Sequence, residues 1–184
     1  MSQKSYSITI MIVQSLLKKG NHIRALAKAL GTNQTTISRK IHQLYDENIV
    51  DFREEGKNKV YFLKKTLEAR EYVFIVEMHK TLQAIKKYPR LRKVIDKIKE
   101  NKRISLAVIF GSYAKGTATK QSDVDLYIET EDKKIKEVAE LIDTKLSVKI
   151  GLYDKKNILI KEIEKDHIII KGVEKFYEKN EFFE

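Results

Sequence analysis

Residues 104–128 read ISLAVIFGSYAKGTATKQSDVDLYI, two short apolar runs separated by a polar loop. The first run, residues 104–110, is rich in β-branched side chains, which predicts a buried strand. Gly111-Ser112 then ends that strand. Glycine lets the backbone approach a ligand closely, and free N–H groups at the start of a following helix attract phosphate. We therefore expect Gly111 and Ser112 to bind the phosphates of a ligand.

Asp123 and Asp125 lie two positions apart at the start of the second apolar run. Side chains at positions i and i+2 of a strand point the same way, so the two carboxylates face one spot, about 6–7 Å apart along the chain. Magnesium prefers one or two carboxylates together with phosphate oxygens and water. The pair predicts a metal site for Mg²⁺ or Mn²⁺ with Asp123 and Asp125 as ligands.

The whole stretch resembles the DNA polymerase β-type nucleotidyltransferase superfamily, especially its small prokaryotic members. The family pattern is a strand, Gly-Ser, a small residue and a Gly a few positions on, and then Ser-Asp-x-Asp-Leu. The matching residues are Gly111, Ser112, Ala114, Gly116, Ser122, Asp123, Asp125 and Leu126. The resemblance covers about the last 80 residues. It implies transfer of NMP from an NTP to a hydroxyl, with Asp123 and Asp125 as catalytic residues.

The chain departs from this family at the third carboxylate, which normally comes from the third core strand. In residues 146–152, LSVKIGL, the apolar side chains hold the even positions, and Lys149 aligns where the acid belongs. Asp143 and Asp154 could replace it only through a bulge or an altered register. Lys149 could instead bind nucleotide phosphates. Loss of one metal ligand argues for reduced or altered catalysis more than for lost binding.

The N-terminal residues 1–66 carry a second constellation. Three helices are expected: the first ends at Gly20-Asn21, Asn21 caps the second, and Thr32 or Asn33 caps the third, which runs to about Asp46. The third helix buries Ile37, Ile41 and Leu44. Its other face presents short polar and cationic side chains of the kinds that reach base edges and phosphates, namely Gln34, Thr35, Thr36, Ser38, Arg39, Lys40 and Gln43.

Residues 49–65 then predict a β-hairpin with a turn at residues 55–58. Together, the third helix and this hairpin resemble the winged helix-turn-helix repressors of MarR and ArsR type, which implies that double-stranded DNA is a partner. The hairpin would contact phosphates through Arg53, Lys57 and Lys59. In residues 1–66, 12 Lys+Arg minus 5 Asp+Glu gives +7 of the total +11, so the excess charge lies mostly here. The alternative is a winged helix used only for protein interaction.

The fold class expected is α+β, with three parts: a winged helix-turn-helix domain (1–66), a helical linker (67–101) and a small mixed-sheet nucleotidyltransferase domain (102–184). In the linker, Ile75, Met78, Leu82 and Ile85 repeat at helical spacing. This stripe either packs within the chain or forms the seam of a homodimer. After the third strand we expect a helix over residues 157–166 and a short closing strand in VEKFYE, residues 173–178.

Composition narrows the function classes. There are no cysteines, which excludes disulfide and cysteine-nucleophile chemistry, and the four histidines are dispersed without metal-ligand spacing. No signal peptide or membrane span is evident, so a cytoplasmic protein with no membrane partner is expected. Two functions remain: a DNA-binding, magnesium-dependent nucleotidyltransferase of unknown acceptor, and a transcriptional regulator whose nucleotidyltransferase-like domain binds a nucleotide or partner without catalysis.

Overall fold

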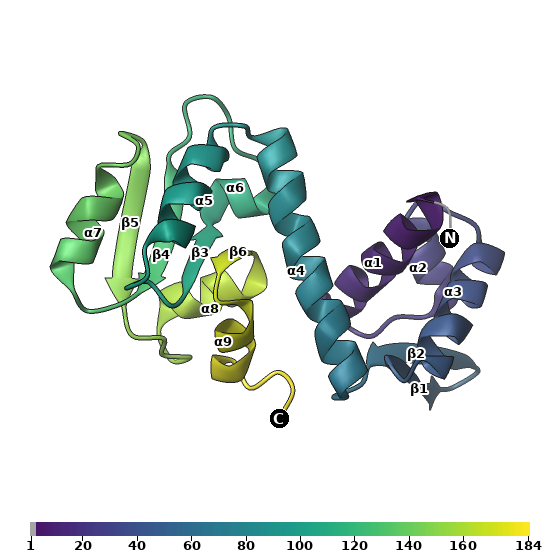
Figure 1. Ribbon diagram of the computed structural model, residues 1–184. Coiled ribbons are helices and arrows are strands. Elements are labelled where there is room, and N and C mark those ends of the chain that lie inside the picture. The colour runs from purple at the N-terminus through teal and green to yellow at the C-terminus, as the bar shows by residue number, and fades with distance from the viewer. Residues whose placement is uncertain (1–2) are drawn as a thin grey trace. The chain divides into compact units, whose positions relative to one another are not determined.

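The computed structural model describes residues 3–184, with side chains from residue 8 onward. It forms two compact units, one made of the chain up to Val76 with Phe183–Glu184, and the other of Glu77–Phe182. Helix α4 (Leu67–Lys87) contributes residues 67–76 to the first unit and residues 77–87 to the second (Figure 1). Of the helices in residues 3–184, none combines the length and the apolar character that crossing a membrane requires.

The first unit contains α1 (Gln3–Lys18), α2 (Ile23–Ala29), α3 (Gln34–Asp46), β1 (Val50–Glu55), β2 (Asn58–Leu63) and the first part of α4. Strands β1 and β2 pair antiparallel from Val50↔Leu63 to Glu55↔Asn58, which leaves the two-residue turn Gly56-Lys57. The helices bury an apolar face against this hairpin, with Leu26, Ile37 and Leu44 fully buried. Three helices followed by a hairpin are the arrangement of a winged helix-turn-helix.

The helix caps of this unit match the expectation at one position and correct it at another. Asn33 caps α3, because its Oδ1 accepts a hydrogen bond from the Thr36 N–H at 2.7 Å. The cap of α2 is His22, whose Nδ1 accepts from the Ala25 N–H at 3.0 Å, and not Asn21. Asn21 instead exchanges backbone hydrogen bonds with Tyr61 of β2 and thereby ties the α1–α2 turn to the hairpin.

The second unit is built on a four-stranded sheet in the order β5-β4-β3-β6: β3 (Ala107–Phe110), β4 (Val124–Glu129), β5 (Leu146–Gly151) and β6 (Ile168–Lys171). Strands β4 and β5 are parallel, and the other pairs are antiparallel. The helices are the end of α4, α5 (Leu91–Glu100), α6 (Gly111–Lys115), α7 (Lys133–Glu140), α8 (Ile158–Lys165) and α9 (Val173–Lys179). This is the mixed α+β architecture that the sequence predicts.

The two faces of the sheet have different neighbours. Val124, Leu126 and Ile128 of β4 join the apolar core that contains side chains of α5 and α7. Asp125, Tyr127 and Glu129 alternate with them and point to the opposite face. There the Glu129 carboxylate pairs with Lys175 and Lys179 of α9 at 3.0 and 2.6 Å. Helix α9 therefore covers the face that carries Asp125.

The end of the chain departs from expectation. The closing strand is β6, IIIK, and VEKFYEK forms helix α9. Phe176 and Tyr177 are neighbours in sequence and both are buried, which a helix packed at its side allows and an alternating strand does not. Gly172, at φ +76°, makes the turn between β6 and α9, and a side chain there would overlap the Ser105 carbonyl.

Candidate nucleotide and metal site

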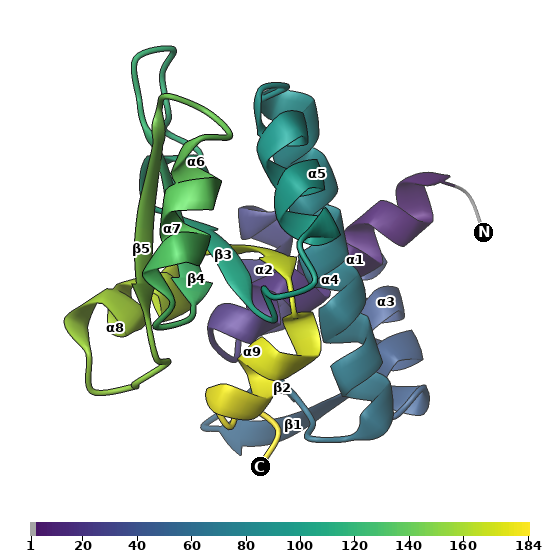
Figure 2. The ribbon, with the colours of Figure 1, turned by 60° about the vertical axis from the view of Figure 1, so that its left-hand side comes forward.

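The centre of the candidate site is the contact between Gly111 and Asp125. Gly111 follows β3 directly and has a φ of +65°, in the left-handed region. A methyl group added at Gly111 would overlap the Asp125 carboxylate. Phe110 pairs with Asp125 across β3 and β4, which fixes this approach by strand register. Figure 2 shows the sheet to which both strands belong. Glycine is therefore required here for two reasons: the backbone conformation and the missing side chain.

Helix α6 and the loop after it, up to residue 122, fold compactly around the carbonyl of Ser112. That oxygen accepts hydrogen bonds from the backbone N–H groups of Thr117 and Ala118, at 2.9 and 3.2 Å. Ser122 closes the loop, because its Oγ accepts from the Thr119 N–H at 2.9 Å. Tyr113 is only 3% exposed, and its hydroxyl donates to the Ser122 carbonyl at 3.4 Å, so it packs under the loop and is not open to a ligand.

Burial and neighbouring charged side chains determine the pKa of Asp125. Partial burial and the negative charge of Asp123 raise the pKa of Asp125, while the positive charge of Lys149 opposes the rise. The nearby Asp123 is exposed. The raised pKa shows that the negative charges of Asp123 and Asp125 repel each other and are not fully balanced by Lys149. A divalent cation between the two carboxylates would balance them. The donor set therefore fits a hard cation such as Mg²⁺.

Lys149 lies on the same side of the sheet as Asp125. In the parallel pairing of β4 and β5, Asp125 is opposite Ser147 and Tyr127 is opposite Lys149, with Lys149 exposed. Asp143 is engaged elsewhere: it forms an ion pair with Arg90 at 2.7 Å and accepts from the Lys145 N–H. Asp154 accepts from the Lys156 N–H in the turn after β5. In the described part of the chain, β5 thus offers the site a cation and no acid.

Two charged side chains near the loop, those of Glu162 and Lys87, were not predicted from the sequence. Glu162 of α8 contributes to the raised pKa of Asp125 and pairs with Lys115 of α6 at 3.2 Å. Lys87, in the last turn of α4, donates to the Gly116 carbonyl at 2.8 Å. Both belong to helices with no motif of their own, so only the tertiary fold reveals them.

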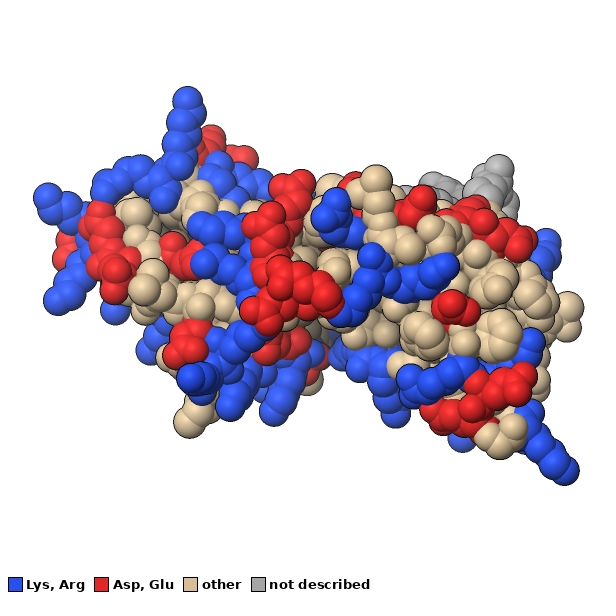
Figure 3. Space-filling view, turned by 90° about the horizontal axis from the view of Figure 1, so that it is seen from below, with Lys and Arg blue, Asp and Glu red and all other residues tan. Residues whose placement is uncertain are grey.

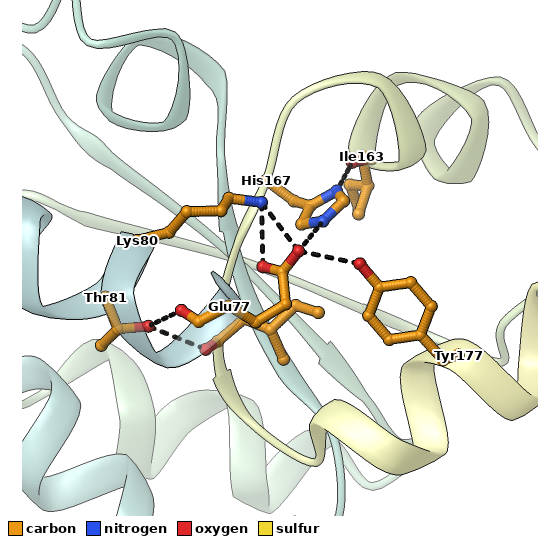
Figure 4. Close-up of polar contacts among 7 residues, drawn as sticks. Glu77, Lys80, Thr81, Ile163, His167 and Tyr177 are labelled. Atoms are coloured by element: carbon orange, nitrogen blue, oxygen red, sulfur yellow. Dashed lines mark hydrogen bonds and ion pairs between the residues drawn. The ribbon is translucent and has the colours of Figure 1, made fainter. Parts of the chain in front are cut away.

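No group of three or more His, Asp or Glu side chains that could hold a metal occurs among the residues described. One buried carboxylate, that of Glu77, is nevertheless surrounded by polar groups (Figure 4). Glu77 of α4 is fully buried, accepts from the Tyr177 hydroxyl at 2.8 Å, and pairs with Lys80 at 2.8 Å and with His167 at 3.3 Å. Burial alone would raise the pKa of Glu77, but these partners outweigh burial and lower the pKa to about 2.

The candidate nucleic-acid surface lies on α3. Ile23, Gln34, Thr35, Ser38, Arg39 and His42 line an open hollow of about 630 Å³. Gln34, Thr35 and Arg39 are exposed, and Thr36 and Ser38 are half-buried. On the hairpin, Lys57 is exposed at the turn, Arg53 pairs with Glu55 at 2.7 Å, and the Lys59 ammonium lies 3.9 Å from the centre of the Phe52 ring.

The placement of Lys40 on this open face is wrong. Lys40 is only 4% exposed, and its ammonium donates to Gln43 Oε1 at 3.1 Å, while Gln43 in turn donates to Glu47. Lys40 follows Arg39 on α3 and shares the buried side with Ile37, Ile41 and Leu44. A long aliphatic stem can lie against apolar neighbours in this way. The open face of α3 therefore carries Arg39 as its cation.

This geometry places the second unit in the class of small mixed-sheet transferases that carry a glycine loop beside a pair of aspartates. The chain belongs to the nucleotidyltransferase domain family, which matches residues 91–183. The match includes the loop and both aspartates and begins just after the end of α4.

Relatives from Methanocaldococcus jannaschii agree with this family. The protein named "Putative protein adenylyltransferase MJ1379" is 33% identical over 101 residues, which is 50% of this chain and 99% of the relative. The one named "Putative protein adenylyltransferase MJ1215" is 37% identical over 83 residues, 43% of this chain and 94% of the relative. Each relative is thus matched over nearly its whole length by about half of this chain.

Among solved structures, the transcriptional repressor BigR from Xylella fastidiosa is similar over 39% of this chain and 73% of its own, with a TM-score of 0.36 and 24% identity. A likeness at this score carries no argument about function. The winged helix-turn-helix assignment rests instead on the order and pairing of α1–α3, β1 and β2.

Proposed function

We propose that this chain is a magnesium-dependent nucleotidyltransferase that moves NMP from an NTP to a hydroxyl, and that it also binds double-stranded DNA. The observation that carries this proposal is the close contact of Asp125 with Gly111, with the second carboxylate, Asp123, near enough to raise the pKa of Asp125. The names of the relatives favour AMP as the group transferred and a protein as the acceptor.

In the proposed reaction, the acceptor oxygen forms a bond to the α-phosphorus, and the bond from that phosphorus to the pyrophosphate oxygen breaks. The hydroxyl proton leaves to solvent. Gly111 and Ser112 lie where the outer phosphates would be bound, and Lys149 offers them a positive charge from β5. Pyrophosphate leaves as an anion, and a nearby cation stabilises its charge.

Asp123 and Asp125 would hold the metal ion, Mg²⁺ or Mn²⁺. When bound, such an ion neutralises charge that develops on the phosphate oxygens. The two carboxylates would fix the position of the metal ion next to Gly111, which has no side chain to exclude a phosphate.

The test uses the purified full chain with ATP or GTP labelled in the α-phosphate, with and without magnesium. Label on the chain itself, on a co-purifying protein or on nucleic acid supports transfer and identifies the acceptor class. Nucleotide binding is followed in parallel by thermal shift. The variant D123N/D125N should lose both labelling and the magnesium-dependent shift while keeping its fold. Equal magnesium-dependent thermal shifts in the wild type and this variant would show that Asp123 and Asp125 do not form a metal–nucleotide site.

A second candidate is a regulator whose nucleotidyltransferase domain binds nucleotide without turnover. The observation in its favour is Lys149, a cation at the β5 position where the resembled family places an acid. On this reading the wild type binds nucleotide but transfers nothing, and Lys149→Asp gains labelling activity. A wild type that labels an acceptor at about 1 s⁻¹ or faster excludes this candidate.

DNA binding is supported by the open face of α3 and by the charge of residues 1–66. Gln34, Thr35, Thr36, Ser38, Arg39 and Gln43 are proposed to face the major groove, and Arg53, Lys57 and Lys59 to contact phosphate. On the face drawn in Figure 3, lysine and arginine side chains are interspersed with acidic ones and form no single block. The DNA proposal therefore rests on the particular side chains of α3 and the hairpin together with the net charge of residues 1–66.

A further inference from the structure

The part of α4 that precedes the family match is built into the nucleotidyltransferase unit. The match begins at residue 91, whereas residues 77–87 of α4 belong to the second compact unit. Ala84 lies in the apolar core of that unit, and Ile85 packs against it. The hydroxyl of Thr81, which is 7% exposed, donates to the Ile169 carbonyl of β6 at 3.1 Å.

The buried Glu77 fixes the other end of this helical segment. Its carboxylate joins α4 to Tyr177 of α9 and to His167, which directly precedes β6 (Figure 4). Oε2 of Glu77 pairs with Lys80 one turn on, at 2.8 Å. A buried, ionised carboxylate with hydrogen-bonded partners is costly to separate from them. The segment from Glu77 to Lys87 is therefore held in a defined position within its unit.

The end of this segment reaches the glycine loop. The Lys87 ammonium donates to the Gly116 carbonyl at 2.8 Å. Gly116 is the left-handed residue that ends α6, and its own N–H donates to the Tyr113 carbonyl. Next to Lys87, the Tyr88 ring meets the Tyr113 ring edge-on at 4.8 Å. Two adjacent residues of the α4 end thus contact α6 and the turn that follows it.

We propose that Lys87 is a positioning residue for nucleotide binding, contributed to the site by a helix outside the family-matched region. This inference rests on the proposed function. By holding the Gly116 carbonyl, Lys87 fixes the C-terminal end of α6, whose first residues are Gly111 and Ser112. It also keeps a positive charge beside the loop that is proposed to receive a triphosphate.

The test compares three variants of the full chain: Lys87→Met, Lys87→Arg and Lys86→Met. Lys86 is the matched control, because it is exposed on the same turn of α4 and its removal changes the net charge equally. Affinity for ATP with magnesium is measured by calorimetry, and backbone hydrogen exchange is followed in peptides covering residues 111–118. We expect Lys87→Met to weaken ATP binding at least threefold and to speed exchange in this loop. Lys87→Arg and Lys86→Met should stay within twofold of the wild type in affinity.

Three outcomes separate the possibilities. If the wild type binds ATP and Lys87→Met binds as tightly as Lys86→Met, the inference is overturned and the proposed function stands. If Lys87→Met lowers only the midpoint of thermal unfolding, the residue is merely structural and the inference again fails. If the wild type binds no nucleotide, the proposed function is overturned, and the role of Lys87 falls with it.

Discussion

Gly111 combines a left-handed backbone conformation with a neighbouring carboxylate that leaves no room for a side chain. Gly56 in the hairpin turn has nearly the same φ, +61° against +65°, but nothing lies within 4 Å of its missing Cβ. Gly56→Ala should therefore cost only the backbone strain, about 1–2 kcal/mol. Gly111→Ala must also displace Asp125, and we expect it to weaken ATP binding at least tenfold. Equal effects of the two substitutions on ATP affinity, measured by calorimetry, would contradict the proposed role of this contact.

The low pKa of Glu77 predicts that the stability of the fold depends on pH. The pKa of this carboxyl group is about 2 in the folded chain against an ordinary value of 4.5. Because the folded pKa is depressed, the stabilisation is fully present above pH 4.5 and is lost as the pH falls from 4.5 towards 2. A shift of this size corresponds to something on the order of 3 kcal/mol.

Urea unfolding of the full chain between pH 6 and pH 2.5 measures this effect. We expect the free energy of unfolding to fall more steeply in the wild type than in Glu77→Gln, which cannot titrate at this position. Glu137→Gln, at an exposed glutamate of α7, is the control and should follow the wild type. Parallel pH profiles for Glu77→Gln and the wild type would show that Glu77 does not carry the dependence.

At the residue scale, sequence reasoning succeeded where the signal was local. Asn33 is followed three positions later by the N–H that it caps, so the N-terminus of α3 could be predicted. Lys40 could not be placed, because the buried side of α3 is wide enough to include an aliphatic stem next to Ile41. The contacts of Glu162 and Lys87 join residues 47 and 29 positions apart, and no local pattern encodes such distances.

At the scale of elements, α3 and the β1–β2 hairpin should fail differently in DNA binding. Lys57→Ala would remove one of the proposed phosphate contacts, so it should weaken binding to all duplexes and reduce the salt slope by roughly one unit. Arg39→Ala should cost about 1–3 kcal/mol at a preferred site and less on random DNA, if Arg39 contacts a base. Lys59 is less suitable than Lys57 for this substitution, since the Lys59 ammonium also lies over the Phe52 ring, and its removal would change that contact too.

Mobility shifts across a salt series, on a selected duplex and on a scrambled one, distinguish these effects. Glu54→Gln, at an exposed acidic side chain of β1, is the control and should not weaken binding. If the wild type binds no duplex below micromolar concentration at low salt, the winged helix is a protein-interaction module and the DNA proposal is withdrawn.

Other elements show where prediction from sequence ended. The three core strands were predictable because each is a short apolar or alternating run that contains β-branched residues and is bounded by turn residues. The closing strand was predicted in VEKFYE, which forms helix α9, and strand β6 just before it was not predicted. What decides the structure of VEKFYE is tertiary: Phe176 contacts the rings of His167 and Tyr153, and Lys175 and Lys179 both reach Glu129. Spacing of four between those lysines places them on one helical face.

For the whole molecule, the open question is how many chains act together. Met78 and Leu82, four residues apart on α4, are 56% and 64% exposed, whereas Ile85 of the same stripe packs against the core of its unit. Adjacent exposed apolar side chains on a helix can form a contact with a second copy. We propose that this pair forms part of a homodimer contact, which would present two copies of α3 to half-sites about 10 base pairs apart.

Sedimentation equilibrium of the full chain tests this dimer. We expect a dimer in the wild type at tens of micromolar and a monomer in Met78→Glu/Leu82→Glu, with thermal unfolding of the monomer unchanged because neither side chain is buried. Leu141→Glu is the matched control: Leu141, the C-cap residue of α7, is 86% exposed and lies off the stripe, so its variant should remain dimeric. A wild type that is monomeric throughout, or a Leu141→Glu variant that dissociates as readily, would show that α4 is not the seam. Binding to a two-half-site duplex should lose cooperativity in the same variant that loses the dimer, since each monomer can then occupy only one half-site at a time.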